Sequence, residues 1–422
     1  MTAIQEALTT VHRLRSTCRS CGEGDLSLVL SLGSTPLANS FLRSRTEFET
    51  EKSFPLDLYY CETCSLVQLL DVIDPEVLFR NYIYVTGTSD TIAAHNVRYA
   101  DTIAELLQLG PADLVVEVAS NDGSLLRCFK KHHVRTLGIE PATNIADQAR
   151  AVGVETLNRF FDRSTARDVR DSHGPAKALI GNNVLAHVDE VRSFLSGCRD
   201  LLTHDGLAIF EVPYLGEMLE RLEYDTIYHE HLSYFSITAL LRLCDYVGLS
   251  VVRIDRVPVH GGSIRVYAAR REHKGEHAGQ VLEMSAGETA DGLTSRSRYD
   301  RFGSDVAESR RALVALLENL RSDGETVAGY GAPAKGNTLL NYCGIDVGQL
   351  PYTVDKNPLK VGMYTPGSHI PVLPVSTILE RRPDYVLLLA WNFADEIMRQ
   401  QQAYRDLGGR FIVPVPRAAV VE

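Results

Sequence analysis

Short apolar runs alternate with helical patterns through the middle of this chain, and this alternation restricts the fold more than any other feature. Four such runs are predicted strands: Leu114–Ala119, Thr136–Glu140, Ala178–Asn182 and Gly206–Pro213. A run that is apolar on both faces is buried on both faces, so repeated β-α-β units predict a parallel sheet with helices on each side. A helical pattern over Asp90–Leu109 precedes the first strand.

The strands change character after residue 249. Ser250–Arg256 and Ser263–Ala269 alternate polar and apolar residues and are joined only by VPVHGG. So short a connection cannot cross over a sheet, and the two strands must therefore pair antiparallel. A parallel sheet that ends in an antiparallel hairpin is typical of the class I methyltransferase fold, a Rossmann-like α/β architecture.

The 422 residues are enough for two or three domains. Short strands with Pro/Gly turns, Ser27–Leu32 and Leu56–Tyr60, mark the first region, and a polar segment, Arg270–Arg301, indicates a linker or an exposed helix. Beyond it the alternation of strands and helices resumes, with apolar runs at 326–329, 352–354, 385–390 and 411–413. We expect a small N-terminal domain, a methyltransferase core and a C-terminal α/β domain, bounded as 1–85, 86–300 and 301–422.

The charge balance and the hydropathy narrow the choice of partners. The formal net charge is −11 and no long basic run occurs, which argues against a nucleic-acid-binding surface. The first residues lack the apolar segment of a signal peptide, and no window holds about 18 consecutive apolar residues. We expect a cytoplasmic protein that binds neither nucleic acid nor membrane.

Two Cys-x-x-Cys pairs predict a metal site. Cys18 and Cys21 form one pair, and Cys61 and Cys64 form the other. The two-residue spacing aims both sulfurs of a pair at one point, and four thiolates complete the tetrahedral shell that Zn²⁺ prefers. Because no position is left for water, the zinc would be structural. Coincidental cysteines or a redox pair are the alternatives.

A turn of small residues follows the first core strand and predicts a cofactor site. The sequence Glu117-Val-Ala119-Ser-Asn121-Asp-Gly123 is a degenerate form of the glycine-rich turn. Glu140 ends the next predicted strand, where an acidic residue accepts hydrogen bonds from ribose hydroxyls in nucleotide-binding sheets. Because this turn lacks the third glycine that cradles a pyrophosphate, it favours S-adenosylmethionine over a dinucleotide. Two asparagines at the end of the predicted strand Ala178–Asn182, Asn182 and Asn183, are expected at the same edge.

The densest polar and aromatic cluster is YDTIYHEHLSYF, residues 224–235, which follows the strand ending in EVPY. A histidine beside a glutamate suits general base chemistry near pH 7, whereas His-Glu-His lacks the spacing of a helical zinc motif. An ordinary polar loop is the alternative. His187, in NNVLAHV, is a further candidate at this edge of the sheet.

Together these motifs resemble one family along essentially the whole chain. The two Cys pairs, VASNDGSLL, NNVLAHV, YDTIYHEHLSYFS, HGGSIRVY and YGAPAKGN occur in the order found in C-methyltransferases of nucleotide-linked ketodeoxysugars. The resemblance implies an S-adenosylmethionine-dependent enzyme of branched deoxysugar biosynthesis, as in antibiotics. It also implies a monomer with a sugar nucleotide, of dTDP type, in a cleft between domains.

The resemblance also implies roles for individual residues. His231 is the expected base, with Glu230 and Tyr228 assisting it or positioning the substrate and His187 lining the same site. Tyr82 corresponds to a tyrosine that closes on the sugar, with Tyr84 as an alternative. The methyl acceptor would be an enolate carbon beside the 4-keto group, at C3 more often than at C5.

A second glycine-rich turn, residues 327–337, lies between a strand and a helix in the C-terminal region. The N–H groups at the start of that helix could hold an anion. Asp355 ends the next strand, as Glu140 does in the core. A diphosphate site is therefore expected here, and the candidate substrate-binding residues are Tyr224, Lys335, Asn337 and Lys356, with Lys360 and His369 nearby.

Three other functions compete with the methyltransferase. The first is a zinc-containing NAD-dependent dehydrogenase that uses both glycine-rich turns. It would require a catalytic metal with an open position, whereas four thiolates saturate the predicted zinc. The second is a non-enzymatic module, in which the zinc domain recruits a partner and the methyltransferase core is inactive. A third function, methylation of RNA, is opposed by the acidic charge balance. For the C-terminal glycine-rich turn itself, the alternative is a packing role without ligand binding.

Overall fold

A four-stranded antiparallel sheet forms the N-terminal part of the computed structural model, which describes residues 11–80, 90–257 and 262–421. Its strand order is β11-β4-β3-β2, and one of its strands, β11, comes from the middle of the chain. A separate pair, β1 and β5, lies beside it. The elements of this part are β1 His12–Leu14, β2 Leu26–Pro36, η1 Arg45–Thr50, β3 Ser53–Cys61, β4 Val67–Leu69, β5 Asp71–Ile73, α2 Pro75–Phe79 and β11 Ser233–Tyr234.

The seven-stranded sheet of the core has the order β12-β13-β10-β9-β6-β7-β8. Strands β6 to β10 pair in parallel, and β13 pairs antiparallel with both β10 and β12. The expected class I methyltransferase fold is therefore confirmed, including the antiparallel hairpin. The strands are β6 Leu114–Val118, β7 Arg135–Ile139, β8 Thr156–Leu157, β9 Ala176–Asn182, β10 Leu202–Pro213, β12 Leu249–Val257 and β13 Ser263–Arg270.

Helices cover both faces of this sheet because its strands are apolar on both faces. One apolar cluster lies between the sheet and α3 and α4, and a larger one lies under α7 and α9 and continues into the other domains. The core helices are α3 Asp90–Leu107, α4 Ser124–Phe129, η3 Lys130–His132, α5 Thr143–Ala151, α6 Arg163–His173, η4 Leu185–His187, α7 Val191–Leu201, α8 Leu215–Glu220, η5 Tyr224–Thr226 and α9 Ile237–Val247.

The third sheet has six strands in the order β16-β15-β14-β17-β18-β19, all parallel except for the last pair. It encloses an apolar cluster of its own. The elements are β14 Val327–Tyr330, α13 Ala334–Cys343, β15 Thr353–Asp355, β16 Val372–Pro374, α14 Thr377–Arg381, β17 Tyr385–Leu388, η6 Trp391–Phe393, α15 Ala394–Gln400, α16 Gln402–Asp406, β18 Arg410–Val413 and β19 Ala419–Val421.

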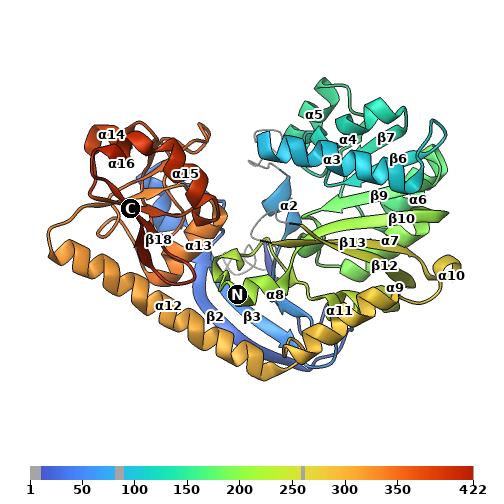
Figure 1. Cartoon of the computed structure of the whole chain (residues 1–422), viewed down its shortest axis with the longest axis horizontal. Helices are drawn as coiled ribbons and strands as arrows, with labels where there is room; N and C mark the ends of the chain where they lie inside the picture. The colour runs from blue at the N-terminus through green and yellow to red at the C-terminus, as the bar shows by residue number, and fades with distance from the viewer. Residues whose placement is uncertain (1–10, 81–89, 258–261, 422) are drawn as a thin grey trace.

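The polar segment 270–301 is mostly helical. It forms α10 Arg271–Lys274, α11 Gly279–Ala290 and the start of α12 Arg296–Ser322. It is more than an exposed linker, because Val281, Glu288 and Tyr299 are buried. The 27-residue α12 runs through the position where we expected the boundary between core and C-terminal domain. Figure 1 shows it along one side of the molecule, from the core to the C-terminal domain.

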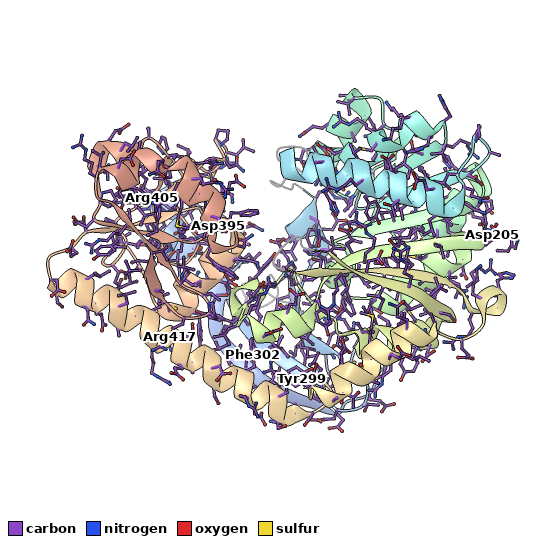
Figure 2. All side chains as sticks on the ribbon, viewed as in Figure 1. Asp205, Tyr299, Phe302, Asp395, Arg405 and Arg417 are labelled. Atoms are coloured by element: carbon purple, nitrogen blue, oxygen red, sulfur yellow. The ribbon has the colours of Figure 1, made fainter. Side chains whose placement is uncertain are left out.

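Aromatic packing fastens this helix to the N-terminal sheet. The Tyr299 ring stacks on Tyr60 of β3 with 4.7 Å between ring centroids, and Phe302 is fully buried one turn later. Figure 2 marks both side chains on the part of α12 that passes the N-terminal strands. Among the described helices, none combines the length and the apolar character that a membrane span needs.

Candidate active site

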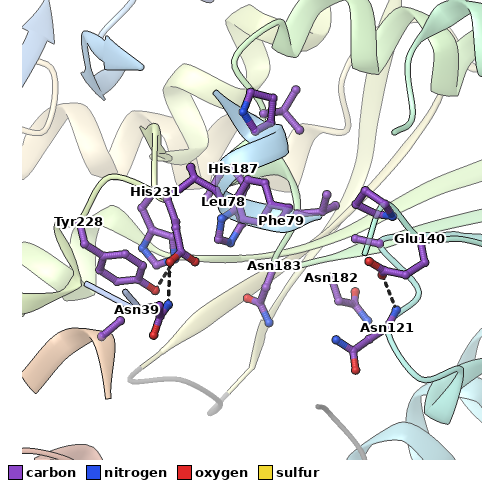
Figure 3. Close-up of a pocket in the computed structure, with 18 of the residues that line it drawn as sticks. Asn39, Leu78, Phe79, Asn121, Glu140, Asn182, Asn183, His187, Tyr228 and His231 are labelled. Atoms are coloured by element: carbon purple, nitrogen blue, oxygen red, sulfur yellow. Dashed lines mark hydrogen bonds between the residues drawn. The ribbon is translucent and has the colours of Figure 1, made fainter. Parts of the chain in front are cut away.

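A cleft of about 1970 Å³ is lined by residues of the N-terminal part, the core and the C-terminal part of the chain. Ligand pockets usually enclose roughly 300–1,000 Å³, so this cleft has room for two ligands side by side. Its wall includes residues of α2, the carboxyl ends of β6, β7, β9 and β10, and the first turn of α13. Figure 3 shows part of this wall.

The turn after β6 has the conformation that a close-lying ligand requires. Ala119, Asn121 and Gly123 all have positive φ, at 53°, 49° and 74°. Gly123 is the N-cap of α4, and a Cβ atom there would lie 2.7 Å from Cγ2 of Val154. Only glycine fits at that position. Gly123 shapes the turn, whereas Ala119 and Asn121 line the cleft themselves.

Two buried carboxyl groups flank this turn. Glu140 accepts hydrogen bonds from the Asn121 and Ala142 backbone N–H groups, at 2.9 and 2.8 Å. The Oε2 atom of Glu117 is buried, and no described residue forms a hydrogen bond with it. Burial raises the pKa of both groups, in Glu117 reinforced by the charges of Asp122 and Glu140. A buried acceptor beside a left-handed turn fits the adenosine and methionine parts of S-adenosylmethionine, which offer hydroxyl and ammonium donors.

The asparagines at the end of β9 also line the cleft. Oδ1 of Asn182 accepts from the Tyr99 hydroxyl at 3.3 Å, and Asn183 has a φ of 52°. The sequence analysis missed the neighbouring Glu211, which pairs with Arg265 and with Nε2 of His95, the latter at 3.2 Å. A glutamate inside the apolar run IFEVP was the signal that could have revealed it.

His231 lies on the opposite side of the cleft, held by both ring nitrogens. Its Nδ1 is 2.9 Å from the Thr226 carbonyl oxygen, and its Nε2 is 2.8 Å from the Tyr228 hydroxyl. A carbonyl oxygen can only accept, so Nδ1 carries the proton. When the ring is neutral, its lone pair is therefore at Nε2, where the Tyr228 hydroxyl donates. The loop thus fixes the tautomer that a general base requires.

Glu230 is placed differently from the expected partner of a histidine. Its Oε1 accepts from the side-chain amide of Asn39, at 2.6 Å. It thereby links the loop to the N-terminal domain at the wall of the cleft. Asn39 has no motif around it, and sequence reasoning missed it for that reason.

His187 lies beside His231, with 4.8 Å between ring centroids, and the edge of the Phe79 ring packs on it. Burial lowers the pKa of His187 to about 4, so this imidazole is neutral at pH 7. It suits hydrogen bonding better than proton abstraction. Tyr82 and Tyr84, the predicted tyrosines that close on the sugar, lie outside the described residues.

The predicted substrate-binding residues divide into two groups. Lys335, Lys356 and Lys360 line the cleft together with Asp355. Nζ of Lys335 lies 3.3 Å from Glu223, and Nζ of Lys360 donates to the Ala332 carbonyl at 2.7 Å. Burial lowers the pKa of Lys360, and Glu223 and Asp355 offset part of the positive charge of this wall.

The remaining predicted residues are packed away from the cleft. Tyr224 is fully buried, with its hydroxyl 3.9 Å from the Cys343 sulfur, because it fills the contact between the loop and α13. Asn337 is equally buried and donates to the Ala38 carbonyl at 2.7 Å. His369 pairs with Glu51 at 2.8 Å and stacks on Phe48. These three therefore join domains instead of facing a ligand.

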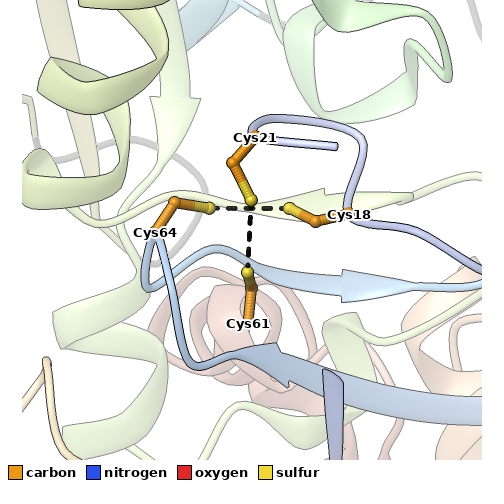
Figure 4. Close-up of side chains that lie close together, drawn as sticks. All are labelled: Cys18, Cys21, Cys61 and Cys64. Carbon is orange, nitrogen blue, oxygen red and sulfur yellow. Dashed lines mark hydrogen bonds between the residues drawn. The ribbon is translucent and has the colours of Figure 1, made fainter. Parts of the chain in front are cut away.

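The four predicted metal ligands converge in the N-terminal domain (Figure 4). All four sulfurs lie within 4.8 Å of one another, and the pairs Cys18–Cys64 and Cys21–Cys61 are both 3.5 Å apart. A tetrahedral shell with Zn–S bonds of about 2.3 Å places sulfurs roughly 3.8 Å apart, so the set fits zinc. The Cys18 thiolate raises the pKa of Cys61 to about 12. All four sulfurs can therefore ionise together only beside a cation that shares their charge.

Comparison with known proteins agrees with this arrangement. Three family models match in succession: "Putative zinc binding domain" over residues 18–79, "Methyltransferase domain" over 93–254 and "C-methyltransferase C-terminal domain" over 258–416. The C-methyltransferase NovU of Streptomyces niveus is 40% identical over 404 residues, which cover 96% of each chain. The chain belongs to this C-methyltransferase family.

Two solved structures overlap the methyltransferase fold. Magnesium protoporphyrin IX methyltransferase of Synechocystis PCC 6803 is 14% identical, covers 43% of this chain and 82% of its own, and gives a TM-score of 0.32. The PH0226 protein of Pyrococcus horikoshii OT3 is 13% identical, covers 47% and 96%, and gives 0.36. These scores are too low to carry an argument, and the fold assignment rests on the family model and the strand order.

Membership of the C-methyltransferase family decides between the competing functions. The chain is an S-adenosylmethionine-dependent C-methyltransferase, and the dehydrogenase alternative is wrong. The thiolate cluster lies in the matched zinc-binding region, which supports a structural Zn²⁺.

Proposed function

We propose that this C-methyltransferase transfers the methyl group of S-adenosylmethionine to a ring carbon of a nucleotide-linked 4-keto-deoxysugar. The observation that carries the proposal is the position of His231, whose Nε2 lone pair and Tyr228 partner line the same cleft as the turn after β6. The likeness to NovU and the whole-chain motif order support the substrate class. The lysines of the opposite wall would hold the diphosphate.

Carbon becomes a nucleophile only after a C–H bond has been acidified. In a 4-keto sugar the proton beside the carbonyl is removable, because the resulting carbanion is delocalised as an enolate. His231 takes this proton at Nε2, either directly or through the Tyr228 oxygen that now donates to it. S-adenosylmethionine supplies an electrophilic methyl group, which the enolate carbon attacks.

The enolate oxygen needs a hydrogen-bond donor that does not itself lose a proton. The neutral His187 imidazole, next to His231, suits this role because its low pKa makes it a poor base. Glu230 and Asn39 form a polar pair that would position the sugar hydroxyls. We propose C3 as the acceptor carbon, with C5 of the same substrate class as the second candidate.

The central test replaces the proposed base. His231→Asn should lower kcat by about 10² to 10⁴-fold and leave the affinity for S-adenosylhomocysteine unchanged, because the cofactor turn lies on the other side of the cleft. His204→Asn, on the surface, is the control that should retain full activity. Full turnover in His231→Asn would contradict the assignment of the base.

The acceptor carbon can be identified without methyl transfer. Incubation of the enzyme in heavy water with S-adenosylhomocysteine and 4-keto nucleotide sugars should introduce deuterium at the carbon from which the base removes a proton. Deuterium at C3 supports the proposed position, whereas deuterium at C5 alone would replace it with the alternative. The same exchange should be lost in His231→Asn.

A further inference from the structure

The strand that follows His231 belongs to the zinc-binding domain. Strand β11 pairs antiparallel with β4, so that Ser233 faces Gln68 and Tyr234 faces Val67. A single residue, Leu232, therefore separates the proposed base from β11. In the same sheet β3 lies next to β4 and ends at Cys61, one of the four predicted zinc ligands. The core supplies the reacting group, and the zinc-binding domain supports the backbone that carries it.

Arg19 makes a second connection between the zinc-binding domain and the core. It lies between Cys18 and Cys21, and its side chain has no exposed surface. One terminal nitrogen donates to the Leu232 carbonyl oxygen, next to His231, and the other lies 3.4 Å from the Asp189 carboxylate. Leu232 directly follows His231, and Asp189 lies two residues after His187, so Arg19 contacts the segments that carry both histidines of the cleft.

Both backbone polar groups of Leu232 form hydrogen bonds. Its carbonyl oxygen accepts from the Leu69 N–H at 3.0 Å as well as from Arg19, and its own N–H donates to the Ala186 carbonyl at 2.8 Å. The turn that precedes it is closed internally, because the His231 N–H donates to the Tyr228 carbonyl at 2.8 Å. The contacts of Leu232 therefore help to fix the position of this turn, together with those that Glu230 and His229 make to the N-terminal domain.

We propose that Arg19 is a positioning residue for methyl transfer, which fixes the His231 turn relative to the His187 loop from its place in the zinc-binding knuckle. A planar guanidinium with five donors can reach a carbonyl and a carboxylate at once, whereas an ammonium group on a flexible stem cannot hold both in place. The four-thiolate site fixes the backbone on both sides of Arg19. The role in catalysis rests on the proposed function of His231, but the anchoring of the loop does not.

Arg15 offers a matched control. It comes from the same domain and donates to the same Asp189 carboxylate at 2.9 Å, but its other carboxylate partner is the exposed Glu190, and within the described part of the chain it makes no hydrogen bond to Leu232. Arg15→Lys and Arg19→Lys therefore both weaken an ion pair with Asp189. Only Arg19→Lys also loses the hydrogen bond to the Leu232 carbonyl, next to His231.

The experiment measures the loop and the reaction separately. In Arg19→Lys we expect zinc content, thermal midpoint and S-adenosylhomocysteine affinity close to wild type, faster amide exchange over residues 226–234, and kcat reduced at least about tenfold with little change in KM. Arg15→Lys should match the wild type in all of these. Arg19→Gln, which also lacks the charge, should reduce kcat further.

Several results would overturn the inference. Wild-type kcat in Arg19→Lys would do so, as would unchanged exchange over residues 226–234, because either would show that the contact does not hold the turn. Loss of zinc from Arg19→Lys would assign Arg19 to the metal site instead. If the exchange rises in Arg19→Lys while His231→Asn retains full turnover, the anchoring stands and the assignment of His231 as the base fails.

Discussion

His229 and His231 are two residues apart, and their surroundings give them different chemistry. His229 is 1% exposed, and its Nε2 donates to the Pro55 carbonyl at 3.1 Å. Burial lowers its pKa to about 4, so it stays neutral and joins the loop to the N-terminal sheet. His231 lines the cleft instead. The sequence His-Glu-His could not show which histidine faces the substrate, because the answer depends on where β3 passes.

The buried His229 makes stability dependent on pH. Its pKa is lower in the folded chain than the usual 6.5, so the unfolded chain binds more protons between about pH 6.5 and pH 4, and stability falls as the pH drops through that window. His229→Gln keeps a donor for Pro55 without the charge. Between pH 7 and pH 4.5 we expect the wild type to lose about 2 kcal/mol more than this variant in urea unfolding.

His204→Gln is the matched control for this measurement, since its side chain is 75% exposed. It should follow the wild type at both pH values. Equal pH dependence of the wild type and His229→Gln would contradict the buried, neutral state of His229.

At the scale of elements, the turn between β6 and α4 is the part of the cofactor site most sensitive to substitution. Gly123→Ala would add the strain of a positive φ and a contact of 2.7 Å with Val154. We expect S-adenosylhomocysteine to bind at least about tenfold more weakly in this variant, measured by titration calorimetry, because the turn must shift to relieve the contact.

Gly153→Ala separates the two causes. Gly153 has nearly the same φ, 75°, but a Cβ there would meet only Nζ of Lys130, at 3.8 Å. This variant should lose about 1 kcal/mol of stability from the backbone strain and keep its cofactor affinity. Equal losses of affinity in both variants would indicate that Val154 is not the cause.

At the scale of the whole molecule, α12 connects the core to the C-terminal domain and packs on the N-terminal sheet. It leaves the core, packs across β2 and ends at β14 of the C-terminal sheet (Figure 1). Gly303 of α12 faces β2, and a Cβ atom there would lie 2.9 Å from the Val29 carbonyl oxygen. A backbone oxygen in a sheet cannot move aside, so the helix would have to.

Two glycine substitutions in helices should therefore have opposite effects. Gly303→Ala should destabilise the chain by about 1–3 kcal/mol through this contact. Gly287→Ala, in α11, meets nothing within 4 Å and should stabilise it by roughly 0.5–1 kcal/mol, because alanine loses less backbone entropy in a helix. Urea unfolding measures both, and stabilisation by Gly303→Ala would contradict the close packing of α12 on β2.

The sequence by itself determined the local features of this protein. Runs that are apolar on both faces predicted the parallel core sheet, and the short VPVHGG connection predicted its antiparallel hairpin. The Cys-x-x-Cys pairs predicted the sulfur cluster. All three signals depend on residues that are close together in the sequence. Tertiary structure decided which distant residues meet. Completion of the zinc-binding sheet by β11, the contact of Arg19 with Leu232, and the burial of Tyr224 and Asn337 between domains all join segments far apart in the chain. No periodicity encodes such contacts, because they follow from how the N-terminal part, the core and the C-terminal part pack around one cleft.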